Sequence, residues 1–146
     1  MEEQGFLESI QQVFPSQEQD IRSYSPLSLA FLGDAVYELV VRTVIVRGPN
    51  RAAAKLHDMT VRYVNAPAQA RMVEIISPLL TQEESDVLRR GKNASPHTIA
   101  KSGSRKEYLR ATGFEALMGY LYLTGRTERM LELVQAGMQG LDGERS

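Results

Sequence analysis

The stretch that decides the fold is AFLGDAVYELVV, residues 30–41. Apolar residues surround this segment on nearly every helical face, which is typical of a buried helix. Asp34 stands in the middle of it, more than two turns inside the expected helix, so its carboxylate cannot cap the free N–H groups at the helix start. A carboxylate taken out of water needs a compensating partner. The sequence therefore predicts a buried acid whose partner is either a basic side chain or a metal ion.

Length and composition indicate one ordinary domain. The chain has 146 residues and no cysteine, so a disulfide framework and a thiolate metal site are both excluded. Its acidic N-terminus lacks the pattern of a signal peptide, and no apolar run is long enough to cross a membrane. We expect a single cytoplasmic domain over residues 1–146, with a loosely packed segment at 1–24 and a loose tail at 141–146.

Helix start and stop signals recur along the chain, and no stretch alternates apolar and polar residues long enough to form a strand. The predicted fold class is all-α. Ser25 followed by Pro26 predicts a helix start, and the pairs Thr81–Glu84 and Ser104–Glu107 are capping boxes. The expected helices span residues 5–13, 26–46, 52–65, 67–76, 82–90, 105–124 and 128–141.

Basic charge is concentrated in one segment. Residues 89–110 contain seven Lys or Arg and one acid, Glu107, a net charge of +6, whereas the whole chain carries −1. Within this segment, residues 91–104 contain a single large apolar side chain, Ile99, and are expected to form a loop. Such a concentration favours a polyanionic partner. A solvated loop with a chance cluster of charges is the alternative.

A second acid occupies a comparable place in the helix expected at 105–124. Glu115 flanks an apolar stripe, and Gly119 one turn later suggests the close approach of another helix or a ligand. If the two long helices pack together, Asp34 and Glu115 can share a hard divalent ion, most plausibly Mg²⁺ with several waters retained. The alternative is that each acid forms a structural ion pair with a neighbouring base such as Arg42 or Arg110.

Two segments resemble a known family. The stretch LAFLGDAVYELVVR, residues 29–42, is similar to the signature helix of the ribonuclease III endonuclease domain, and FEALMGYLYL, residues 114–123, is similar to its second carboxylate helix. The segment from Val87 to Gly125, together with the short chain, narrows the resemblance to the Mini-ribonuclease III branch, which lacks the double-stranded RNA-binding domain. The similarity covers the chain from about Leu27 to the last helix.

This resemblance implies a helical bundle that acts as a homodimer and cleaves double-stranded RNA with Mg²⁺. Asp34 and Glu115 take the places of the catalytic, metal-binding acids. Two further acids of the family pattern are replaced here, by Ala30 one turn before Asp34 and by Thr112 three residues before Glu115. We therefore expect weaker metal binding, with more of the coordination supplied by water and RNA phosphate.

Without a separate RNA-binding domain, the catalytic domain has to recognise RNA itself. Lys, Arg, Ser and Asn side chains suit the phosphates and 2′-hydroxyls of A-form RNA. The expected RNA-binding residues are Arg89, Arg90, Lys92, Asn93, Ser95, Lys101, Ser102, Arg105 and Lys106.

The substrate that the Mini branch implies is precursor 23S ribosomal RNA, with a large-subunit ribosomal protein as a further candidate partner. The missing acids at Ala30 and Thr112 leave a non-catalytic RNA-binding or ribosome-assembly module of the same fold as the alternative function. A helical protein-interaction domain, in which Asp34 and Glu115 are merely ion-paired, is a further alternative.

Overall fold

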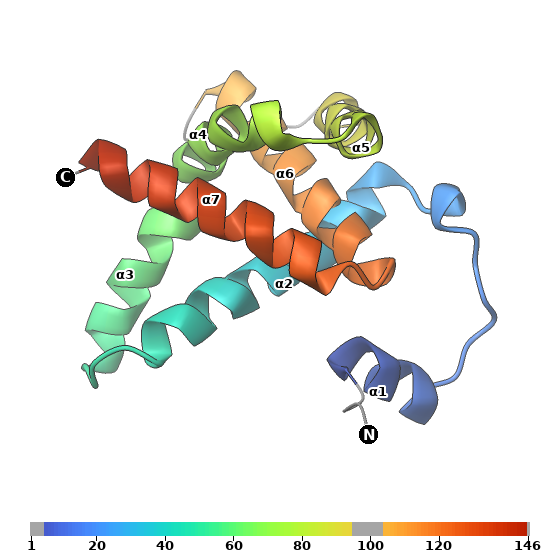
Figure 1. Cartoon of the computed structure of the whole chain (residues 1–146), viewed down its shortest axis with the longest axis horizontal. Helices are drawn as coiled ribbons and strands as arrows, with labels where there is room; N and C mark the ends of the chain where they lie inside the picture. The colour runs from blue at the N-terminus through green and yellow to red at the C-terminus, as the bar shows by residue number, and fades with distance from the viewer. Residues whose placement is uncertain (1–4, 95–103, 146) are drawn as a thin grey trace.

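The computed structural model in Figure 1 describes residues 5–94 and 104–145, and every regular element in these ranges is helical. This confirms the predicted all-α class. The α-helices are α1 (Phe6–Val13), α2 (Pro26–Val46), α3 (Ala53–Val64), α4 (Ala66–Ile76), α5 (Gln82–Asn93), α6 (Arg105–Leu123) and α7 (Thr127–Arg145). Two short 3₁₀ turns, η1 (Ile21–Ser23) and η2 (Ser77–Leu79), complete the described elements.

The predicted helix starts are confirmed because they depend on local hydrogen bonds. The Ser25 side chain accepts a bond from the Ser28 N–H at the start of α2. Both halves of each capping box form, with Thr81 and Glu84 opening α5 and Ser104 and Glu107 opening α6. Gly125 follows α6 with a φ of 74°, the left-handed conformation that glycine adopts without strain, and so ends that helix as expected.

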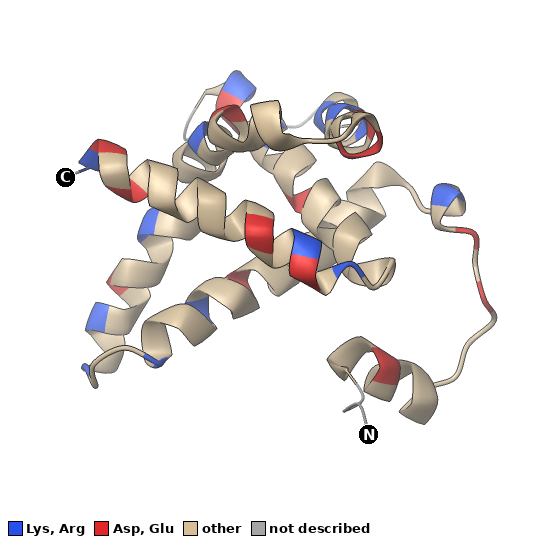
Figure 2. Cartoon of the chain, in the orientation of Figure 1, with Lys and Arg blue, Asp and Glu red and all other residues tan. Residues whose placement is uncertain are grey.

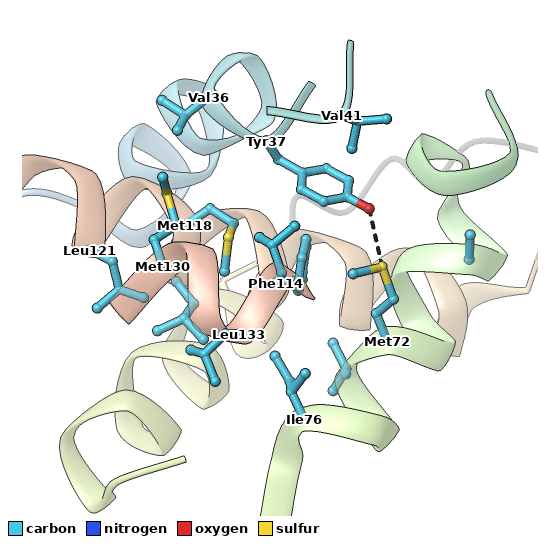
Figure 3. Close-up of a cluster of buried hydrophobic side chains, with 14 of the residues drawn as sticks. Val36, Tyr37, Val41, Met72, Ile76, Phe114, Met118, Leu121, Met130 and Leu133 are labelled. Carbon is cyan, nitrogen blue, oxygen red and sulfur yellow. Dashed lines mark hydrogen bonds between the residues drawn. The ribbon is translucent and has the colours of Figure 1, made fainter. Parts of the chain in front are cut away.

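The core is built around α6, which α2, α4, α5 and α7 contact (Figure 1). The Tyr37 ring of α2 meets the Phe114 ring of α6 edge to face, with centroids 4.9 Å apart. Its hydroxyl donates to the Tyr63 carbonyl at 2.8 Å and lies 3.1 Å from the Met72 sulfur (Figure 3). The ring of the buried Tyr37 therefore packs against α6, while its hydroxyl has a hydrogen-bond acceptor. This residue connects α2 to α6 and to the junction of α3 and α4.

The prediction that residues 30–41 are buried all round is wrong. Helix α2 buries one face, which includes Ala30, Gly33 and Tyr37, and leaves the opposite face open. Phe31 on that open face is 85% exposed, and Asp34 is exposed as well. The reason is tertiary, because α6 covers α2 from one side and no described helix buries the other.

Two expected helix ends are also wrong. Helix α5 continues past Gly91 to Asn93, because Gly91 is a packing residue: a Cβ there would lie 2.7 Å from the Ala116 Cβ of α6. Helix α7 continues through the supposed tail to Arg145. Leu141 is only 4% exposed, so burial of this side chain draws the last turns onto the bundle.

The N-terminal segment packs differently from the rest. Helix α1 has no buried residue, and its apolar side chains Phe6 and Val13 are largely exposed. Figure 1 shows α1 beside one end of the bundle, joined to α2 by an extended connection. None of the helices described combines the length with the apolar character that crossing a membrane requires.

Candidate active site

A glycine-to-glycine crossing of α2 and α6 forms the centre of the candidate site. A Cβ on Gly33 would lie 1.7 Å from the Glu115 carbonyl oxygen, and a Cβ on Gly119 would lie 2.0 Å from the Leu29 carbonyl oxygen. No side chain fits in either place, so the two backbones touch. The close approach expected at Gly119 is thus that of another helix.

This crossing brings the two candidate acids together. Asp34 follows Gly33 on α2, and Glu115 lies one turn before Gly119 on α6. Asp34 is exposed, whereas Glu115 is partly buried. Burial, followed by a hydrogen bond with Asp34 and its negative charge, raises the pKa of the Glu115 carboxyl to about 8, against the opposing effect of a hydrogen bond from Gln69. The pair is therefore a site of concentrated negative charge when both acids are ionised.

Asp34 and Glu115 do not form the structural ion pairs with Arg42 or Arg110 that were the alternative expectation. Arg42 binds Glu38 at 3.2 Å, and Arg110 binds Glu74. Within residues 5–94 and 104–145, no Lys, Arg or His pairs with Asp34 or Glu115. Among the described residues, the partners of Glu115 are thus Asp34 and Gln69 and not a basic side chain.

The two replaced positions of the family pattern lie in packed surroundings. Ala30 is buried against Leu29 and Ala116, where α2 meets α6. Thr112 is buried, and its hydroxyl donates to the Tyr108 carbonyl at 3.0 Å. Accordingly, the described part of the chain contains no group of three or more His, Cys, Asp or Glu side chains able to hold a metal ion.

Gln69 of α4 is a polar neighbour of Glu115 that the sequence analysis missed. Its side chain hydrogen bonds to the Glu115 carboxyl, and the whole residue is 3% exposed. A signal was present in the sequence: Gln69 occupies the first position of an apolar stripe that continues with Met72, Val73 and Ile76. A glutamine at a core position of a helix has to find polar partners inside the protein.

The expected RNA-binding residues fall into two described groups. Four of them lie at the C-terminal end of α5, and Arg105 and Lys106 lie at the start of α6 (Figure 2). All are exposed except Lys92, which is half-buried. The α5 group consists of Arg89, Arg90, Lys92 and Asn93.

The remaining three expected RNA-binding residues, Ser95, Lys101 and Ser102, lie outside the described residues. For the α5 group the structure adds a spatial relation. Gly91 packs against Gly113 and Ala116, the segment of α6 that carries Glu115. The C-terminal end of α5, which carries these basic residues, therefore packs against the same turns of α6 that carry Glu115.

A family model described as the ribonuclease III domain matches residues 27–126, which include both acids and the glycine crossing. The chain belongs to the ribonuclease III family. It is similar to a protein named Mini-ribonuclease 3 from Thermoanaerobacter sp., with 45% identity over 94% of this chain and 95% of that protein. Another Mini-ribonuclease 3, from Symbiobacterium thermophilum, is 49% identical over 76% of this chain and 85% of its own.

A crystal structure of a Fusobacterium nucleatum protein has a similar fold. It superimposes with a TM-score of 0.76 at 32% identity, and the match covers 84% of this chain and 98% of the other. These relatives confirm the resemblance to the Mini-ribonuclease III branch. The protein is an endoribonuclease of the ribonuclease III family, and the non-catalytic alternatives are set aside.

Proposed function

We propose that this ribonuclease III protein hydrolyses phosphodiester bonds in double-stranded RNA with Mg²⁺, and that Asp34 and Glu115 are its catalytic, metal-binding residues. The observation that carries the proposal is the contact of Gly33 with the Glu115 backbone, which places two unpaired acids beside each other. Acids held together without a basic partner repel each other, and a divalent cation relieves that repulsion.

The donors present fit Mg²⁺. Asp34 and Glu115 supply carboxylate oxygens as ligands, and the buried Gln69 amide, which contacts Glu115, has an oxygen that no described donor uses and that is a neighbouring acceptor, not a ligand. Magnesium is commonly bound through one or two carboxylates while it keeps several waters. When bound, the cation lowers the pKa of coordinated water and stabilises charge on the attacked phosphate. Asp34 and Glu115 would hold the ion.

Substrate recognition is assigned to the basic surface made of Arg89, Arg90, Lys92, Asn93, Arg105 and Lys106, with Ser95, Lys101 and Ser102 of the neighbouring segment. The packing of Gly91 of α5 against the turns of α6 that carry Glu115 supports this assignment, because one duplex could then contact both helices. Because Lys and Arg contacts to phosphate displace counterions, binding should weaken steeply as salt is added.

A homodimer is supported by the open face of α2. Phe31 is 85% exposed, and Leu39 and Val44, each more than half exposed, line a groove of about 820 Å³ between α2, α1 and α7. Apolar surface left open in one chain favours burial against a second. Two copies would supply one acidic site for each strand of a duplex. Sedimentation of the purified protein tests this assembly.

Precursor 23S ribosomal RNA is the proposed natural substrate, in the cytoplasm, with a large-subunit ribosomal protein as a candidate presenting partner. The support is the similarity to the Mini-ribonuclease III branch together with the absence of cysteine from the chain.

Cleavage of a long double-stranded RNA with Mg²⁺ tests the proposal. Asp34→Asn and Glu115→Gln should each lower the cleavage rate by at least about 100-fold, because each removes a carboxylate that holds the cation. RNA binding, measured in parallel by gel shift, should persist in both variants, since the basic surface is unchanged.

Glu38→Gln is the matched control, because Glu38 lies one turn beyond Asp34 on α2 but is paired with Arg42. This variant should cut at the wild-type rate. Wild-type protein that binds the duplex and never cuts it with Mg²⁺ or Mn²⁺ would refute the proposed activity. Cleavage at the wild-type rate by Asp34→Asn and Glu115→Gln would instead show that the catalytic residues lie elsewhere in the protein.

A further inference from the structure

The Gln69 amide is held in one orientation inside the protein. Its nitrogen Nε2 donates to the Val64 carbonyl at 2.9 Å, at the junction of α3 and α4. A carbonyl oxygen can only accept a hydrogen bond, so the amide atom that faces it has to be the nitrogen. The Asn65 side chain caps the start of α4 by accepting from Ala68 N–H at 2.8 Å, which stabilises the turn that carries Gln69.

This orientation leaves the other end of the amide without a partner. Gln69 Oε1 is the one buried side-chain nitrogen or oxygen atom, among the described residues, that has no hydrogen-bond partner. Buried amide oxygens are normally satisfied, and an exception suggests a missing water, ion or ligand. The hydrogen bond of this amide to the Glu115 carboxyl therefore comes from its nitrogen, and the unsatisfied oxygen belongs to the same amide group that contacts one member of the acidic pair.

A cation held by only two carboxylates needs hydrogen-bond acceptors for the water molecules that it keeps. Mg²⁺ keeps most of its hydration shell in such a site, and the hydrogens of those waters need acceptors. On the protein side, Ala30 and Thr112 stand where the family pattern has acids: Ala30 has no polar side chain, and Thr112 offers only an uncharged hydroxyl, held by its bond to the Tyr108 carbonyl. Gln69 Oε1 is a buried acceptor beside Glu115 that no described donor uses.

We propose that Gln69 is a positioning residue of the divalent-cation site: its amide holds the Glu115 carboxyl in place, and its Oε1 accepts a hydrogen bond from water in the hydration shell of the ion. This inference rests on the proposed Mg²⁺ dependence. It assigns a role to a neutral residue from a third helix, α4, whereas the two acids come from α2 and α6.

Binding of Mn²⁺ to the full chain without RNA tests the inference, with the free ion followed by electron paramagnetic resonance. Gln69→Met keeps the length of the side chain and removes the amide. We expect the Kd for Mn²⁺ to rise about tenfold, the size of effect seen when a hydrogen-bond partner of a metal's ligands is lost. Asp34→Asn, measured alongside, should bind Mn²⁺ still more weakly because it loses a ligand.

Thr60→Val is the matched control for a merely structural effect. Thr60 is also buried, and its hydroxyl donates to the Leu56 carbonyl at 2.8 Å, so both variants lose one side-chain bond to a backbone carbonyl. Both should lower the melting temperature, but Thr60→Val should leave the Kd for Mn²⁺ unchanged. If Gln69→Met does not fold, Gln69→Asn withdraws the amide by one methylene and is judged by the same outcomes.

The outcomes separate this inference from the function on which it rests. A wild-type Kd in Gln69→Met, together with lost binding in Asp34→Asn, overturns the role of Gln69 and leaves the metal site standing. Absence of Mn²⁺ binding by the wild type overturns both. A rise in Kd for Gln69→Met alone among the two buried-polar variants supports the inference.

Discussion

Two glutamates on neighbouring helices, Glu84 and Glu115, have opposite surroundings. Glu84 at the start of α5 is 2% exposed and has every partner it needs: Arg129 of α7 donates through Nε and Nη2 at 2.9 Å each, and the Thr81 N–H adds a third bond. Arg129 also donates to the Leu79 carbonyl at 2.8 Å. Glu115 is partly buried beside another acid and has no basic partner among the described residues.

The pKa values follow these surroundings. The hydrogen bonds from Arg129 hold the pKa of Glu84 below its ordinary value, whereas burial and Asp34 raise that of Glu115 to about 8. The fold therefore stabilises the ionised form of Glu84 and destabilises the ionised form of Glu115. A carboxylate that is buried, paired and capped serves the structure, while a carboxylate kept beside another acid is suited to bind a ligand.

The largest effect should come from the crossing that creates the acidic site. In Gly119→Ala the new Cβ would meet the Leu29 carbonyl at 2.0 Å, so α2 and α6 have to separate. We expect a loss of about 4 kcal/mol or more in the free energy of unfolding, measured by urea denaturation. Gly143→Ala is the control, since a Cβ there meets no atom within 4 Å. A folded Gly119→Ala protein of wild-type stability would show that the helices do not touch.

Removal of Arg129 from its ion pair with Glu84 should give the next largest loss of stability. Arg129→Met leaves Glu84 buried without its base, and we expect a loss of about 3 kcal/mol at pH 7. The folded pKa of Glu84 is lowered, so its contribution is present above the unfolded value of 4.5 and is lost as the pH falls through the folded pKa. The wild type and Arg129→Met should therefore converge in stability on acidification. A constant difference down to pH 2 would contradict this account.

The smallest effect should have the opposite sign. Glu115→Gln removes a carboxylate whose charged form destabilises the fold. The free energy of unfolding of the metal-free protein should therefore rise by about 1 kcal/mol above pH 8, a small gain because Glu115 is partly exposed. The folded pKa of Glu115 is raised, so its cost is absent below 4.5 and grows as the pH rises toward about 8. Denaturation in a chelator at pH 5 and pH 9 measures the gain, which should appear at pH 9. A loss of stability at pH 9 would place Glu115 in the same class as Glu84.

The sequence predicted the residues of the acidic site better than their surroundings. Asp34 and Glu115 were identified from their place in two helical segments, but Asp34 was expected to be buried and is exposed. The error arose because apolar residues on all faces of 30–41 indicate burial only if every face is covered by the same chain. Gln69 was missed for a related reason, since its buried amide gains meaning only from Val64 and Glu115, which other elements place beside it.

The sequence by itself determined where helices begin, because caps such as Ser25, Thr81 and Ser104 act within three residues of themselves. It also determined that the chain is helical throughout its described parts and that Gly125 ends α6. The tertiary structure alone decided that Gly91 packs rather than terminates, that α7 continues past Leu141, and that Gly33 and Gly119 bring two acids together. Those outcomes depend on contacts between helices far apart in the chain, and no local pattern specifies such contacts.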